Sequence, residues 1–316
     1  SAIQGFYFEA AQALKLEWDA ALNDSEDPKN LFGPRPTIWK TIGDEVLFAK
    51  TITDHRQIVI TLHVWMNALR RVRTFLEAEN SSLGVKSFCW VAGFPFRNRE
   101  VVIDNSLADG IDEEDYYSAN GRRLNKYYAD QNKNKLSGII IDFVGPAIDT
   151  GFRIGAFASA RKLVVSIDVA YLVSMTQFDG EVRRIDFYYD GSTNLKGVIG
   201  GQNYPIFWVD VSSDNSLFRK EDRLREISPV AKEDLKEYCE GFYNEHSGFV
   251  FRPFIDGDVG GVLSKRPQWY DEYQKNLLAN FEAANERYKL GSRSSALQGD
   301  ELSEESRKAL LERLKE

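Results

Sequence analysis

Hydrophobic and polar positions follow two different spacings along this chain. From Thr53 or Asp54 onward, apolar residues recur every three or four positions, which predicts a long amphipathic helix with one buried stripe. The stripe comprises Ile58, Leu62, Trp65, Met66, Leu69, Val72 and Leu76. Residues 9–22 have the same spacing and also predict a helix. Residues 2–6, in contrast, are predicted to be the end of a strand that enters a loop.

Other segments have the short, apolar or alternating pattern of strands. Residues 37–42 and 45–51 predict a hairpin that turns at Gly43-Asp44. Further strands are expected at 87–93, 100–103, 138–144, 163–167, 182–189 and 204–211. A helix is expected within residues 146–160, and further helices are expected at 169–175, 231–245, 269–290 and 301–316. A polar stretch rich in Tyr and Asn, 104–134, predicts an insertion or a lid.

This order of elements predicts an α+β fold with helices on one face of an antiparallel sheet. We expect a first domain over residues 1–211, with the insertion at about 104–135. A mainly helical extension over residues 212–316 follows it. The last segment, 299–316, is strongly charged and is expected to be only loosely attached.

The amino-acid composition of the chain argues against several classes of function. The net charge of −8 argues against a nucleic-acid-binding surface, although it leaves room for a polyphosphate ligand held by a few local cations. Cys89 and Cys239 match no metal or redox spacing, which favours a reducing, cytoplasmic setting. No apolar run is long enough to span a membrane. Three scattered histidines, His55, His63 and His246, argue against a histidine-based zinc site or a catalytic triad.

Two short motifs carry candidate chemistry. A carboxylate at a hairpin tip, Asp44, projects beyond its sheet and suits a magnesium ion shared with phosphate oxygens, although Gly-Asp is also ordinary turn chemistry. Asp142-Phe-Val-Gly-Pro-Ala-Ile-Asp149-Thr-Gly-Phe-Arg153 places an acid before a strand-to-helix turn. Asp149 and Arg153 then lie four residues apart and are expected to be neighbours on one helix face.

Taken together, these motifs resemble those of the class III nucleotide cyclases. That family has an Asp-Ile-x-Gly-Phe strand, then a Lys-x-x-Gly-Asp hairpin, then an Asp-x-x-Gly-x-x-x-Asn-x-x-x-Arg segment. This chain has Ile3-Gln-Gly-Phe6, Lys40-Thr-Ile-Gly-Asp44 and Asp142 to Arg153 at matching spacings, so the resemblance covers about residues 1–175. It implies a ferredoxin-like core of βαββαβ type. The phrase Gly-Pro-x-Ile-Asp-x-Gly-Phe-Arg is similar to the uridylate and cytidylate cyclases of the bacterial Pycsar antiphage systems.

The resemblance also implies a set of roles. Asp44 and the backbone of Ile3 would bind two Mn²⁺ or Mg²⁺ ions, Gly5 and Phe6 would contact the substrate, and Lys40 with Asp142 would read the base. Arg153, paired with Asp149, would stabilise the transition state while UTP or CTP is cyclised and pyrophosphate is released. Lys40 and Asp142 can pair with cytosine, uracil or adenine, so they do not select one base.

Two departures from the family pattern matter. Ala2 occupies the position of the family's first metal-binding aspartate, and alanine cannot bind a cation. The chain as given is therefore expected to be nearly inactive, either as an engineered form or as a naturally degenerate enzyme. Asp149 replaces the asparagine that is usual in purine cyclases.

The family further implies a head-to-tail homodimer with composite sites, and a separate downstream effector that senses the cyclic nucleotide. No nucleic-acid or membrane partner is expected. Two alternatives stay open. Gly43-Asp-Glu45 also resembles the Gly-Gly-Asp-Glu-Phe loop of diguanylate cyclases, although Ile42 replaces the first glycine. A nucleotide-binding regulatory dimer that has lost catalysis would equally explain Ala2.

Overall fold

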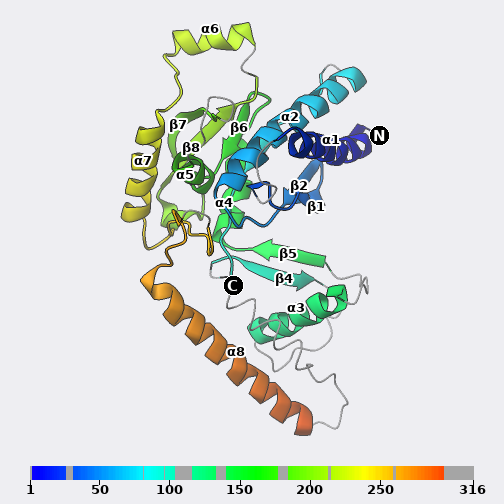
Figure 1. Ribbon diagram of the computed structural model, residues 1–316, viewed down its shortest axis with the longest axis vertical. Coiled ribbons are helices and arrows are strands. Elements are labelled where there is room, and N and C mark those ends of the chain that lie inside the picture. Colours follow the sequence, from blue (N-terminus) through cyan, green and yellow to red (C-terminus); the bar gives the residue numbers. More distant parts are fainter. Residues whose placement is uncertain are drawn as a thin grey trace. The chain divides into compact units, whose positions relative to one another are not determined.

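The computed structural model describes residues 2–25, 31–80, 82–95, 97–103, 116–132, 140–176, 184–212, 215–258 and 261–294, and these residues form a mixed α+β structure. The chain divides into two compact units (Figure 1). Unit 1 comprises Ser1–Gly93 and Gly145–Lys265, and unit 2 comprises Phe94–Val144 and Arg266–Glu316. The predicted α+β class is confirmed, whereas the specific cyclase core and the division at residue 211 stay predictions.

Unit 1 begins with a helix where a strand was predicted. Helix α1 runs over Ala2–Asp24, so the prediction of a strand at residues 2–6 is wrong. The physical reason is that the apolar stripe of α1 continues back to Phe6, which packs against the core shared with α2 (Arg56–Glu79). Gly5 allows close packing there, because a Cβ at this position would lie 3.1 Å from the ring of Phe75.

Helix α2 has apolar residues on two faces and takes part in two cores. One face carries Ile60, Val64 and Val72 and packs with α1. The other face carries Ile58 and Leu62 and packs toward the larger core of unit 1. Both predicted helices in this region, residues 9–22 and the stretch from about residue 54 to 76, are confirmed.

The predicted hairpin is also confirmed. Strand β1 (Thr37–Ile42) pairs antiparallel with β2 (Glu45–Ala49), with an irregularity between Ile38 and Lys40. Gly43 has a φ of 60°, in the left-handed region that favours glycine, which explains why the tight turn forms at this position. Leu47 is buried under the hairpin.

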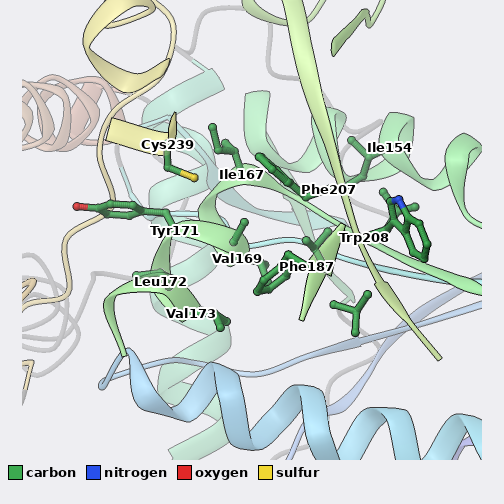
Figure 2. Close-up of a cluster of buried hydrophobic side chains, with 14 of the residues drawn as sticks. Ile154, Ile167, Val169, Tyr171, Leu172, Val173, Phe187, Phe207, Trp208 and Cys239 are labelled. Atoms are coloured by element: carbon green, nitrogen blue, oxygen red, sulfur yellow. The ribbon is translucent and has the colours of Figure 1, made fainter. Parts of the chain in front are cut away.

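A four-stranded mixed sheet forms the centre of unit 1. Its strand order is β3 (Ser87–Cys89), β6 (Lys162–Val165), β8 (Asn203–Asp210) and β7 (Phe187–Asn194). Strand β3 is parallel to β6, and the other neighbours are antiparallel. Helices α5 (Ile167–Met175) and α7 (Lys232–Glu245) pack with this sheet around a core that includes Trp208, Phe207 and Phe187 (Figure 2).

Helix α4 (Pro146–Ile154) leads from the unit boundary toward β6, and a short 3₁₀ turn over Gly155–Phe157 follows it. The sequence predicted a helix within residues 146–160, and α4 confirms it. Helix α6 (Ser216–Leu224) buries no residue of its own. Its attachment to the sheet therefore depends on polar and cation–π contacts.

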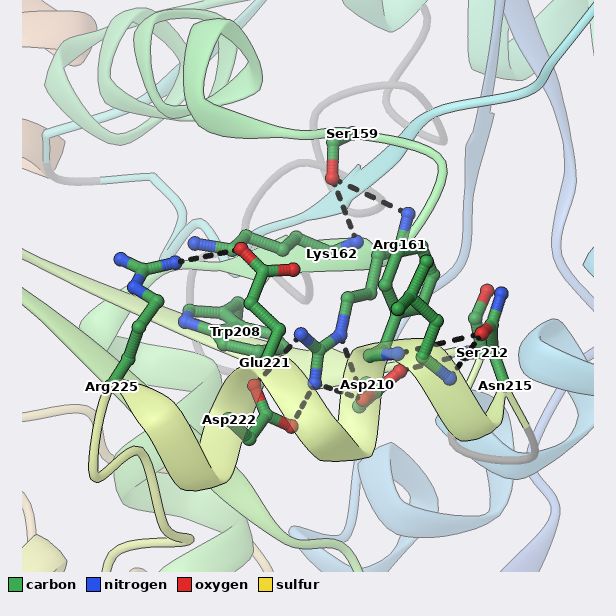
Figure 3. Close-up of polar contacts among 12 residues, drawn as sticks. Ser159, Arg161, Lys162, Trp208, Asp210, Ser212, Asn215, Glu221, Asp222 and Arg225 are labelled. Carbon is green, nitrogen blue, oxygen red and sulfur yellow. Dashed lines mark hydrogen bonds and ion pairs between the residues drawn. The ribbon is translucent and has the colours of Figure 1, made fainter.

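Those contacts centre on Arg161, which binds two carboxylates (Figure 3). Its Nε and Nη2 atoms lie 3.0 and 2.8 Å from Oδ2 of Asp210, and its Nη1 lies 2.8 Å from Oδ1 of Asp222 on α6. The hydrogen bonds from Arg161 hold the pKa of Asp222 below its usual value. The guanidinium also lies 4.9 Å from the ring centre of Phe218. Arg161 thus joins the ends of the two central strands, β6 and β8, to α6.

The described residues of unit 2 form a two-stranded antiparallel sheet and two helices. Strand β4 (Arg99–Ile103) pairs with β5 (Ile140–Val144). Helix α3 (Tyr116–Asn132) lies within the predicted insertion and is tied to β4 by the Asn120 side chain, which bonds the backbone of Val102 and Glu100 at 3.0 and 2.8 Å. Helix α8 spans Gln268–Ser294. The helix predicted at 301–316 lies outside the described residues.

Candidate functional site

The turn that carries Asp44 lies beside the first turns of α1. The hydroxyl of Tyr7 donates a hydrogen bond to the backbone carbonyl of Gly43. Asp44 itself is exposed at the tip of the hairpin. This contact brings the segment with the Ile3-Gln-Gly-Phe6 motif next to the hairpin with the Lys40-Thr-Ile-Gly-Asp44 motif. The Ile3-Gln-Gly-Phe6 segment is helical and not a strand. Ala2 is the first residue of α1, and Ile3, one position on, is 48% exposed.

The hairpin also meets α4, which carries the third motif. The Lys40 ammonium lies 4.3 Å from the ring centre of Trp39 and 5.7 Å from that of Phe152 on α4. The Trp39 and Phe152 ring centres are 6.2 Å apart. Trp90, which follows β3, completes the group at 5.5 Å from Phe152. We call Trp39, Trp90 and Phe152 the aromatic cluster, and Lys40 lies at its edge.

Helix α4 has the local structure that its sequence predicts. Gly145 precedes the helix with a φ of 141°, Pro146 occupies the first turn, and the acidic Asp149 lies near the positive end of the helix dipole. Asp149 and Arg153 are confirmed as neighbours, with Oδ2 of Asp149 2.8 Å from Nε of Arg153. The hydrogen bond that Arg153 donates to Asp149 raises the pKa of Arg153.

The Asp149–Arg153 pair is solvent-accessible. The side chains are 48% and 37% exposed, so the ion pair itself contributes little to stability. Arg153 also lies close to the loop after β7, because a Cβ at Gly197 would be only 3.7 Å from its Nη2 atom. An exposed guanidinium on a short helix, next to a glycine loop, is able to receive an anionic ligand.

The other predicted site residues are distributed differently. Asp142 lies on β5 in unit 2, where it pairs with Val101 and accepts a hydrogen bond from the Phe143 amide at 2.9 Å. Gly5 and Phe6 are partly buried, and Phe6 packs on the α1–α2 core. The structure therefore brings Lys40, Asp149 and Arg153 into one region of unit 1 and gives Phe6 a packing role.

A second polar centre was not predicted from the sequence. Asp54, His55 and Asp258 are all buried, and their ligand atoms lie within 4.8 Å of one another, so these residues could hold a metal ion. Nδ1 of His55 lies 3.0 and 2.9 Å from the two carboxylate oxygens of Asp258. Burial raises the pKa of Asp54, but hydrogen bonds from Arg56 outweigh it and hold that pKa below its usual value.

Sequence reasoning missed this centre for two reasons. Asp54 was interpreted only as a helix start signal, a role it does have, because its Oδ1 accepts a hydrogen bond from the Arg56 amide at 2.9 Å. Asp258 belongs to a Gly-Asp-Val-Gly-Gly loop that was interpreted as chain punctuation. Nothing in the local pattern indicates that His55 and Asp258, 203 residues apart, are in contact.

Comparisons with known proteins add no assignment: no family model, no curated protein and no solved structure matches this chain. Within the described part of the chain, no helix combines the length and apolar character needed to cross a lipid bilayer.

Proposed function

We propose that this chain is a nucleotide cyclase of the class III type that acts on a pyrimidine nucleoside triphosphate, UTP or CTP. The supporting observation is that three segments distant in sequence meet in unit 1. Tyr7 joins the start of α1 to the turn before Asp44, and Lys40 lies over the ring of Phe152 next to Arg153. These are the segments that carry the family-like motifs.

The proposed reaction uses cations and carboxylates in separate roles. The ribose 3′-hydroxyl loses its proton to water and its oxygen bonds to the α-phosphorus. The bond from that phosphorus to the α–β bridging oxygen breaks, and pyrophosphate leaves with the electron pair. Arg153 stabilises the charge on the α-phosphoryl oxygens, because its planar guanidinium offers two parallel donors. Asp149 fixes the direction of that guanidinium through its 2.8 Å hydrogen bond. Lys40 binds the base edge.

Metal binding at the hairpin tip would rest on Asp44. When bound, two Mn²⁺ or Mg²⁺ ions lower the pKa of the attacking hydroxyl and neutralise the triphosphate. An exposed carboxylate at a turn fits Mg²⁺, which takes one or two protein carboxylates and completes its shell with water and phosphate oxygens. Ala2 offers no ligand, so we propose that the chain as given binds nucleotide but turns it over very slowly.

A homodimer is part of the proposal, because the family builds each site from two chains. One face of the β4–β5 sheet in unit 2 carries exposed apolar side chains that suit such a contact, beside the charged Arg99 and Asp142. Ile103 and Ile140 are paired directly across β4 and β5 and are 40% and 60% exposed, and Val144, two residues further along the same face from Asp142, is 45% exposed. Sedimentation of the purified chain tests this part separately.

The activity test compares this chain with Ala2→Asp, incubated with each of the four nucleoside triphosphates and Mn²⁺. We expect a 3′,5′-cyclic pyrimidine nucleotide from Ala2→Asp alone, identified by mass spectrometry. The matched controls, Ala2→Asp combined with Asp44→Ala or with Arg153→Ala, should form at least about 100-fold less product. If Ala2→Asp forms no cyclic nucleotide, the cyclase proposal is wrong.

Ala2 favours one alternative, a nucleotide-binding regulatory dimer without catalysis. In that case UTP or CTP would bind both forms, measured by calorimetry, and neither form would give product. A linear or cyclic dinucleotide made from GTP would instead indicate a diguanylate-cyclase-like enzyme. In the cyclase case we further propose a cytoplasmic antiphage signal, produced on infection and read by a separate effector that senses the cyclic nucleotide.

A further inference from the structure

We propose that Asp54, His55 and Asp258 form a structural binding site for one divalent transition-metal ion, with Zn²⁺ as the best-suited probe. The site is separate from Asp44 and from the nucleotide chemistry proposed above. One imidazole nitrogen together with carboxylate oxygens is a donor set that Zn²⁺ accepts.

The donor atoms converge on one point. Nδ1 of His55 lies 3.0 and 2.9 Å from the Asp258 oxygens and 3.7 Å from Oδ1 of Asp54. Zinc bonds of about 2.0–2.2 Å in a tetrahedron place neighbouring donors about 3.3–3.5 Å apart, within the range of these distances. A single proton on Nδ1 forms a good hydrogen bond to one oxygen at a time, whereas an ion can bind one donor atom from each of the three residues at once.

Burial and charge make a cation favourable here. The side chains of Asp54, His55 and Asp258 are only 4%, 4% and 0% exposed. With a neutral imidazole, two carboxylates face one guanidinium, that of Arg56, which leaves a net charge of −1 in the interior. An uncompensated buried charge costs several kcal/mol. A divalent ion supplies positive charge. A proton on His55 would do the same without metal, and the experiment below separates the two cases.

The surrounding groups hold the two carboxylates in place, as second-layer partners of metal ligands do. Asp54 receives Nη2 of Arg56 at 2.6 Å and Nε of Arg56 at 3.0 Å, in addition to the Arg56 amide. Asp258 receives the His55 amide at 2.9 Å and the Leu263 amide at 3.3 Å. Each carboxylate therefore has a fixed orientation toward Nδ1 whether or not the ion is present.

An ion at this position would link two distant segments of unit 1. Asp54 and His55 immediately precede α2, whereas Asp258 lies in the loop that leads to the unit boundary at Lys265. The ligands come together only in the folded chain, so the ion binds the folded state and stabilises it. Its expected role is to fix the start of α2 to the loop before unit 2 resumes.

The first measurement is the metal content of the full chain, purified without chelator or metal-affinity resin. We expect about one transition-metal ion per chain. After treatment with a chelator and its removal, Zn²⁺ in about 100-fold excess over its dissociation constant should raise the melting temperature by roughly 5 °C. This comparison uses the unsubstituted chain, so it does not depend on the folding of any variant.

Variants then assign the ion to its ligands. His55→Gln and Asp258→Asn should abolish both the bound metal and the Zn²⁺-dependent shift. His246→Gln controls for adventitious binding to another histidine, and Asp44→Ala separates this site from the proposed nucleotide metals; both should keep the ion. An unsubstituted chain that holds no metal and melts at the same temperature with and without Zn²⁺ would overturn the proposal and leave a metal-free ion-pair cluster.

Discussion

Trp90 and Gly151 are packed so closely that a Cβ added to residue 151 would lie 2.2 Å from the Cδ2 atom of the indole. The indole has little freedom to move away, because it also stacks on Phe88, with ring centres 5.7 Å apart and planes 13° apart. Gly151 is therefore the residue that allows α4 to lie against the aromatic cluster. The position of Arg153, two residues later on the same helix, depends on this contact.

We expect Gly151→Ala to destabilise the protein by about 1–3 kcal/mol, because the added methyl group overpacks the interface with Trp90. Chemical denaturation monitored by tryptophan fluorescence measures this. Gly241→Ala is the matched control: Gly241 lies within α7, is exposed, and would place its Cβ in open space. That substitution should stabilise the protein by about 0.5–1 kcal/mol. Equal stabilities for the two variants would contradict the packing described.

Asp168 should make stability fall as the pH rises. This carboxyl group, in the first turn of α5, accepts a hydrogen bond from the Tyr243 hydroxyl at 2.7 Å. Burial raises its pKa from 3.8 to about 6, although the hydrogen bond from Tyr243 acts in the opposite direction. Between about pH 4 and 6 the folded state therefore holds more protons than the unfolded state. The stabilisation is complete below pH 4 and is lost as the pH rises through 6.

Asp168→Asn tests this directly, because asparagine keeps an acceptor for Tyr243 and does not ionise. We expect the variant to be more stable than the parent at pH 7.5, by at most about 3 kcal/mol, and the advantage to shrink toward pH 4. Denaturation midpoints at several pH values give the answer. A variant with an unchanged pH profile would show that Asp168 ionises normally in the folded protein.

Asp222 should control the local stability of α6. Asp222→Asn weakens the link from Arg161 to α6 but leaves Asp210 bound to the guanidinium. Because α6 buries no residue, amide hydrogen exchange in this helix should accelerate by about tenfold, equivalent to 1.4 kcal/mol. The global melting temperature should change little. Glu221→Gln, whose side chain is 51% exposed, is the control and should leave exchange in α6 unchanged.

Lys40 should matter for ligand binding more than for folding. Its ammonium lies at the edge of the aromatic cluster, over Trp39 and Phe152. Lys40→Met keeps the aliphatic stem and removes the charge, so we expect about tenfold weaker UTP or CTP binding by calorimetry. The melting temperature should stay within roughly 2 °C of the parent. Unaltered affinity would remove Lys40 from the proposed base-binding set.

The parts of the fold that the sequence predicts well are those set by local signals. Gly43 marks the hairpin turn because of its left-handed backbone, and the spacing of Ile58 to Leu76 marks α2. The four-residue separation of Asp149 and Arg153 also predicted their contact correctly. Residues 2–6 were wrongly predicted to end a strand, because the helical stripe of α1 continues back to Phe6, which packs with α2.

The relationships that the sequence does not predict are those made by tertiary packing. No local pattern indicates the two carboxylate partners of Arg161, which lie 49 and 61 residues away. The contact between His55 and Asp258 is more distant still. None of these aspartates has a sequence pattern of its own, because a single aspartate has many ordinary roles. Only the folded arrangement of the chain identifies them.

The His55–Asp258 contact has a consequence for how the protein is made. A ribosome adds about 5–20 residues per second, so roughly 10–40 s separate the synthesis of these two residues. The first segment of unit 2, residues 94–144, is made within that interval. The start of α2 is therefore made well before Asp258, the carboxylate partner of His55, and part of unit 2 is synthesised in between. Unit 1 reaches its final form only late in translation, when the loop around Asp258 returns to it.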